Sequence, residues 1–235
     1  MRSARALAAT LMLFAPLGAA LAQLDLSGHW APEPHVRNVP QAQLVPAVTR
    51  EVLATQAAHD AYAVRWCNAV GMPAMTDATL DVRQAGRYLV IASEAHSFAR
   101  FVYLDLPRRD PDILDPASVG YSDGRWEGDT LVVETYGFAG YDYRLPDDQQ
   151  QVKGLTAIPG GGFRTPTSRL VERLTLGGDG DVLVVESTWT DPAVFRMPHT
   201  YVYRYHRRAP SYEPPLGVYC DPFDAARARF LGGGE

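Results

Sequence analysis

The chain has 235 residues, a formal net charge of −5 and 21% charged residues. This mild acidity excludes an ordinary nucleic-acid-binding protein, because phosphate contacts require a basic face. The length suffices for one domain with a substantial core, which we expect over residues 23–235.

Residues 1–22 have the pattern of a cleaved signal peptide. Arg2 and Arg5 precede an apolar run from Ala6 to Leu21, and small residues stand before Gln23, where a signal peptidase would cut. The run is short and contains a proline, which disfavours an uncleaved membrane anchor. The sequence therefore predicts a periplasmic or secreted protein with no membrane span in its mature part.

The two cysteines are Cys67 and Cys220. In an oxidising compartment an isolated pair most simply forms a disulfide bond, and we expect one here. A free, reactive thiol on either residue is the alternative.

Taken in chain order, the sequence predicts a short strand, one early helix and then a series of strands. Leu24–Trp30 is a short strand, and Thr49 can cap a helix over 50–66 with apolar residues at helical spacing. Turn residues then separate runs rich in Val, Leu, Tyr and Thr, as antiparallel hairpins require. The expected strands are 80–84, 88–95, 99–105, 124–126, 130–136, 168–176, 181–191 and 199–206, with longer loops over 107–116 and 146–166.

This pattern predicts a mainly β fold with one N-terminal helix, either a closed antiparallel barrel or a two-sheet sandwich. Gly28-His29-Trp30 favours the barrel, since it is similar to the Gly-x-Trp pattern that opens lipocalin-like barrels. That resemblance implies a Trp30 ring that fills the closed end and packs on a late-strand arginine such as Arg204.

Several motifs together resemble a family of secreted, mostly uncharacterised bacterial proteins with a G-R-W-E-G-D-T-L-V-V-[DE]-T segment and a suspected lipocalin-like barrel. The residues that carry the likeness are Asp25–Trp30, Cys67–Met75, Gly120–Phe138, Val171–Leu176, Asp191-Pro192 and Tyr219-Cys220. Two positions depart from the family pattern, where Ala69 replaces a proline and Tyr121 replaces a histidine. The resemblance implies a barrel and export, and it brings no known substrate.

Two clusters could carry chemistry. Glu94 and His96 alternate on a strand and share a face, so Glu94 could orient His96 as a general base, or both could lie on a solvent face beside Arg100. Arg125 and Glu127 likewise share a face. Inside a barrel they could hold a polar ligand group or stabilise negative charge, and beside the turn they could form a structural ion pair.

Aromatic residues supply the candidate ligand contacts. Tyr201 and Tyr203 alternate on one face of a strand, and Tyr121, Trp126 and His199 complete the predicted set. Met72-Pro73 and Met197-Pro198 could offer soft copper ligands, but no His-x-His or Cys-x-x-Cys pattern supports a metal. These dipeptides fit apolar plugs in tight loops equally well, and no metal or cofactor is expected.

The favoured function is an exported barrel that binds a small apolar or aromatic molecule in its cavity. One alternative is a cofactor-free isomerase, hydratase or lyase that uses His96, Glu94, Arg125 and Glu127 in the same cavity. A structural or envelope-interaction module is the second alternative. Fold alone does not choose among them, because barrels host both carriers and enzymes.

Overall fold

The computed structural model describes residues 24–33, 39–48, 71–73, 78–94, 98–139, 141–144, 151–154, 156–158 and 162–213. The predicted signal segment 1–22, the predicted helix over 50–66, Cys67 and Cys220 lie outside the described residues. Within these ranges, the helical elements are two short 3-10 turns. No helix in this part of the chain has the length and apolar character needed to cross a membrane.

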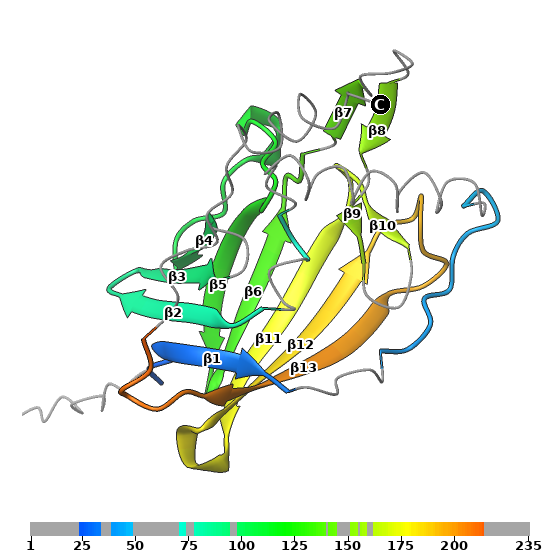
Figure 1. Ribbon diagram of the computed structural model, residues 1–235. Helices are drawn as coiled ribbons and strands as arrows, with labels where there is room; N and C mark the ends of the chain where they lie inside the picture. Colours follow the sequence, from blue (N-terminus) through cyan, green and yellow to red (C-terminus); the bar gives the residue numbers. More distant parts are fainter. Residues whose placement is uncertain are drawn as a thin grey trace, which may run out of the picture.

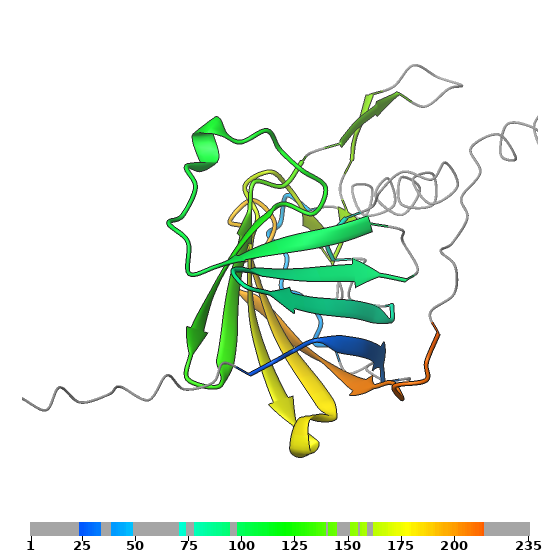
Figure 2. The same ribbon diagram turned by 90° about the vertical axis from the view of Figure 1, so that its left-hand side faces the viewer.

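A closed barrel forms the body of the protein (Figure 1). The strands described around it run in the order β1-β13-β12-β11-β6-β5-β4-β3-β2. In Figure 2, blue β1 lies between β2 and β13, where the barrel closes. The bounds are β1 Gly28–Pro32, β2 Leu80–Ala85, β3 Tyr88–Ser93, β4 Phe98–Leu104, β5 Tyr121–Glu127, β6 Thr130–Tyr136, β11 Arg169–Gly177, β12 Val182–Thr190 and β13 His199–Arg207.

The predicted barrel is confirmed, with one difference in strand direction. Neighbouring strands are antiparallel except for β4 and β5, which pair in parallel. The cause is the connection between them, since residues 105–120 return the chain to the end of the barrel where β4 began. This connection contains the 3-10 turn η2 (Pro111–Ile113), which Asp110 caps through a hydrogen bond from the Asp112 amide.

Tight turns set the register of the hairpins. The predicted turns at 84–87, 127–129 and 177–180 join β2 to β3, β5 to β6 and β11 to β12, and the last contains the 3-10 turn η3 (Gly178–Gly180). Residues 146–166 were expected to be a loop, yet they contain three of the four strands that form two short β-ribbons. One pairs β7 (Tyr141–Arg144) with β8 (Gln151–Gly154) and stands apart from the barrel wall, and the other pairs β9 (Thr156–Ala157) with β10 (Phe163–Arg164) (Figure 1).

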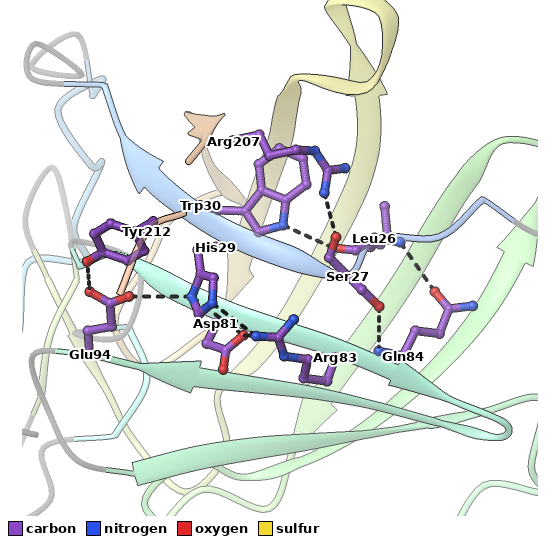
Figure 3. A network of polar contacts seen from close by, with 10 residues as sticks. All are labelled: Leu26, Ser27, His29, Trp30, Asp81, Arg83, Gln84, Glu94, Arg207 and Tyr212. Atoms are coloured by element: carbon purple, nitrogen blue, oxygen red, sulfur yellow. Dashed lines mark hydrogen bonds and ion pairs between the residues drawn. The ribbon is translucent and has the colours of Figure 1, made fainter. Parts of the chain in front are cut away.

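Trp30 fills one end of the barrel. Its side chain is fully buried, its indole Nε1 donates to the Leu26 carbonyl oxygen at 3.0 Å, and the Arg207 guanidinium lies 4.2 Å from the ring centroid (Figure 3). Arg207 also donates to the carbonyl oxygens of Ser27 and Gly180, at 2.5 and 3.1 Å. The expected buried tryptophan is therefore confirmed.

The arginine that covers Trp30 is Arg207, and the expectation of Arg204 was wrong. Position 204 has the opposite strand parity from the inward residues of β13, so Arg204 points outward and contacts Glu33 at 3.3 Å. Gly28 helps the closure, because a Cβ atom there would lie 2.5 Å from Nη1 of Arg207 and its φ of +153° disfavours other residues.

Replacing Arg207 by leucine should lower the free energy of unfolding by about 1–2 kcal/mol, because a desolvated cation–π contact and two carbonyl hydrogen bonds are lost. Arg204→Leu on the same strand is the matched control. It should change stability by less than about 0.5 kcal/mol, since its ion pair is exposed. Urea denaturation of both variants measures the difference, and equal effects would contradict the stacking role of Arg207.

Candidate functional site

An arginine lies inside the barrel. Arg100 is 3% exposed, and its guanidinium reaches across β5 and β6 to Glu172 on β11, which is also 3% exposed. Arg100 Nη2 and Glu172 Oε2 are 2.5 Å apart. This is a buried ion pair between strands that are far apart in sequence, and the closure of the barrel brings them together.

Hydroxyl groups satisfy two further donors of Arg100. Nε donates to Ser122 Oγ at 2.8 Å, and Nη2 donates to Thr135 Oγ1 at 2.8 Å. Those two hydroxyls lie 2.9 Å from each other. Nη1 meets only the sulfur of Met72 among these contacts, at 3.9 Å, and a thioether is a weak acceptor.

Strand alternation explains why these polar residues face inward. Arg100 shares its face of β4 with Val102 and Leu104, and Glu172 shares its face of β11 with Leu170 and Leu174, all of them buried. The alternative that placed Arg100 on a polar outer face with Glu94 and His96 was wrong for Arg100, for this reason. The sequence does contain a signal for this site. Arg100 and Glu172, which have opposite charges, each alternate in phase with the apolar residues of their strand.

The pair borders a small cavity with otherwise apolar walls. The free space is about 20 Å³, enough for one or two water molecules. Besides Arg100 and Glu172, its lining residues are Met72, Leu80, Val82, Ile91, Leu174, Leu183, Val185 and Tyr205.

Met72 enters this interior from a loop and is not part of the barrel wall. Its side chain is 1% exposed, and its amide donates to the Ser118 carbonyl oxygen at 3.2 Å. Gly71 allows this approach, because a Cβ atom at that position would lie 1.8 Å from the same oxygen. Arg164 donates to that oxygen as well. The predicted plug at Met72 is thus confirmed, whereas Met197 is 53% exposed and is not a plug.

The predicted aromatic residues divide between the two faces of the wall. Tyr201, Tyr203 and His199 point inward and are buried, and Tyr201 accepts a hydrogen bond from Trp189 Nε1 at 3.0 Å. Trp126 is partly buried and packs on the core. Tyr121 lies on the outer face instead, where its hydroxyl donates to the Asp115 carbonyl oxygen at 2.6 Å.

Arg125 and Glu127 also lie on the outer face. Their side chains are 58% and 40% exposed, they contact each other at 2.8 Å, and Arg173 joins Glu127 at 3.1 Å. Hydrogen bonds from Arg173 and then Arg125 lower the pKa of Glu127. Of the two interpretations of this pair, a structural ion pair beside the turn describes the geometry. The barrel wall separates it from the interior residues Tyr201 and Tyr203.

Arg125 borders a surface groove of about 180 Å³ between β5 and the start of the 105–120 connection. The groove contains both signs of charge, and Arg108 and Glu134 contact each other there at 3.0 Å. Its lining residues are Asp105, Leu106, Arg108, Asp123, Gly124, Arg125 and Glu134. The charges therefore largely compensate one another.

Glu94 belongs to a third cluster, on the outside of β1 and β2 (Figure 3). His96, its predicted partner, lies outside the described residues. The histidine described beside Glu94 is His29, whose Nδ1 is 3.7 Å from Glu94 Oε1 and 3.7 Å from Asp81 Oδ1. Arg83 Nη2 lies 3.0 Å from His29 Nε2. Since arginine only donates, Nε2 accepts and the neutral ring carries its proton on Nδ1.

Tyr212 joins this cluster from the chain segment after β13. Its hydroxyl donates to Glu94 Oε2 at 2.6 Å, and its ring packs edge-on against His29 with centroids 5.4 Å apart. The hydrogen bond to Glu94, followed by burial and the charge of the carboxylate, raises the pKa of Tyr212. The cluster therefore favours the neutral phenol.

Among the residues that the structure describes, no three His, Cys, Asp or Glu side chains are arranged to hold a metal ion. No protein-family model and no curated protein sequence matches the chain. The interior pair Arg100–Glu172 is the candidate functional site, because it combines charge and burial with adjoining free space.

Removing one partner of the interior pair should be strongly destabilising. Arg100→Met or Glu172→Leu should each lower the free energy of unfolding by about 3–5 kcal/mol, because a buried charge is left uncompensated. The double variant should lose much less than the two single losses combined. Chemical denaturation of the four proteins gives the coupling energy.

The control for this cycle is the exposed pair on the outer wall. Arg125→Met and Glu127→Leu should each have little effect on stability and should act additively, because solvent screens this pair. Additive losses at Arg100 and Glu172 would show that the interior pair is not coupled.

Stability should decrease as pH rises above about 10. Tyr212 and Tyr136 both have a folded-state pKa raised above the ordinary value of 10.0, by the Glu94 hydrogen bond and by burial respectively. The native protein thus holds these protons more tightly than the unfolded chain. The two tyrosines therefore contribute fully to the free energy of unfolding below pH 10. This contribution is lost as the pH rises through their pKa values in the folded protein. Denaturation across this range should show the decrease, and Tyr212→Phe should reduce it.

Glu94→Gln identifies the cause of the shift at Tyr212. Removal of the carboxylate charge should move the pKa of Tyr212 back toward its ordinary value, which phenolate absorbance can follow. No change in this titration would mean that Glu94 does not govern Tyr212.

Proposed function

We propose that this chain is an exported β-barrel protein that binds a small, largely apolar or aromatic molecule in its interior. The observation that supports this function best is the Arg100–Glu172 pair at the wall of an otherwise apolar cavity. Apolar walls with a few convergent polar groups are typical of small-molecule sites. The signal-like residues 1–22 support export, and so do the motifs similar to those of secreted bacterial proteins.

Stability alone does not account for the pair. Replacing a buried ion pair by well-packed apolar residues is often neutral or stabilising, so a barrel of this kind does not need charges in its centre. Ser122 and Thr135 hold the Arg100 guanidinium in one place by hydrogen bonds. A fixed polar group in a largely apolar interior is useful for orienting a ligand.

Binding is better supported than cofactor-free catalysis at the predicted residues. Stabilisation of developing charge requires donors in a water-excluded site, where electrostatic interactions are strong. Arg125 and Glu127 are exposed to solvent and already paired with each other and with Arg173. Their position favours the binding function over the isomerase, hydratase or lyase alternative.

Met72 occupies the space that a ligand would use. Its side chain lies against the free space and contacts Arg100, and the cavity beside it has room for only one or two waters. Because Met72 comes from a loop, its side chain can leave without any change in strand pairing. Ligand entry therefore exchanges the thioether for part of the ligand.

Met72→Ala should create a ligand site of useful size. We expect a small neutral probe such as benzyl alcohol to bind this variant at least about tenfold more tightly than the wild type, since no side chain must be displaced. The empty variant should be about 2–5 kcal/mol less stable, and saturating probe should recover part of this loss. NMR titration and thermal unfolding with and without the probe measure both effects.

Met197→Ala is the matched control, because Met197 is 53% exposed and remote from the cavity lining. It should leave both affinity and stability unchanged. If Met72→Ala binds the probe no better than Met197→Ala, the interior is not a ligand site and the proposed function fails.

A further inference from the structure

The charge at the wall of the cavity is already balanced. Arg100 and Glu172 carry opposite charges 2.5 Å apart, and the other cavity-lining residues are uncharged. A second carboxylate beside them would add net negative charge to a region of low dielectric, next to Glu172. Burying such a charge without a partner of its own is costly.

The balanced pair, which lines the cavity, still has hydrogen-bonding capacity. Among the described residues, the acceptor at Arg100 Nη1 is the weak Met72 Sδ, and the contact of Glu172 uses Oε2 and leaves Oε1 available. Ser187 is the cross-strand neighbour of Glu172. Its buried Oγ has no hydrogen-bond partner in the described part of the chain. One strong donor and one strong acceptor therefore stand next to each other.

From this arrangement we infer, on the basis of the proposed binding function, that the ligand carries a neutral group that both donates and accepts a hydrogen bond. A hydroxyl, phenol or primary amide meets this requirement. Its oxygen would accept from Arg100 Nη1 in place of the Met72 sulfur, and its O–H or N–H would donate to Glu172 Oε1. A free carboxylate has no proton to donate and would be repelled by Glu172.

The rest of the ligand must be apolar and small. Leu80, Val82 and Ile91 line the cavity on one side, and Leu183 and Val185 line it from β12. Displacing the Met72 side chain and one or two waters leaves room for about six to nine non-hydrogen atoms. A single aromatic ring with one polar substituent has this size.

The test compares benzamide with benzoate, which have nearly the same shape and differ in charge. Wild-type protein should bind benzamide at least about tenfold more tightly than benzoate, measured by NMR titration of the intact mature protein at neutral pH. The Met72→Ala variant should show the same preference with tighter binding of both compounds.

Glu172→Gln reverses the electrostatics of the site. It removes the charge that compensates Arg100, so benzoate should gain at least about tenfold in affinity relative to benzamide. Glu127→Gln is the control, since its carboxylate lies on the outer wall with Arg125 and Arg173, and it should leave the preference unchanged. If Glu172→Gln does not fold, the preference of wild type and Met72→Ala decides alone.

The outcomes separate this inference from the proposed function. Preference for benzamide in wild type, reversed by Glu172→Gln, supports the neutral ligand class. Equal affinities, or a preference for benzoate, overturn the inference while interior binding stands. No binding of either compound to wild type or to Met72→Ala overturns the proposed function, and the inference with it.

Discussion

The buried contact between Arg100 and Glu172 constrains each strand of the barrel wall from β4 to β11. Both charges are inside, so every strand between them must present a group that tolerates or bonds the guanidinium. Ser122 on β5 and Thr135 on β6 do so, and they are themselves cross-strand neighbours. A slip of two residues in any of these strands keeps the same face inward, but it would move a polar partner away from the guanidinium and leave a charge uncompensated. The pair thus selects one register from those that the hydrophobic pattern would permit.

The same contact determines the composition of β5. The Arg100 side chain crosses the inner face of this strand, and the inward positions beside it are Ser122 and Gly124. A Cβ atom on Gly124 would lie 2.8 Å from the Val102 side chain. Large polar residues such as Arg125 consequently occupy the outer positions. Space, as well as polarity, decides which face of β5 is inside.

Most of the fold could be predicted from the sequence because it rests on local signals. Alternation marked the strands, Gly-Asp and Gly-Gly turns marked the hairpins, and Gly28-His29-Trp30 indicated the closed end. The parallel pairing of β4 and β5 could not be predicted, since it depends on the path of the long connection between them. The site was missed for a similar reason. Arg100 and Glu172 are separated by 72 residues, and only closure of the barrel makes them neighbours.

The two arginine–glutamate pairs show why residue type alone does not identify a site. Arg125 with Glu127 and Arg100 with Glu172 have the same chemical groups at 2.8 and 2.5 Å. Water screens the first pair, so its two side chains can separate at little cost. A ligand gains little by bonding to them, because water bonds to them equally well. The second pair lies in an apolar interior, where an unmet hydrogen bond is expensive. Any molecule that completes the bonds of Arg100 Nη1 and Glu172 Oε1 there replaces the weak thioether acceptor of Met72. The burial of the pair therefore makes a ligand that lacks the matching hydrogen bonds bind weakly. The balance of the two charges makes a neutral ligand bind better than a charged one.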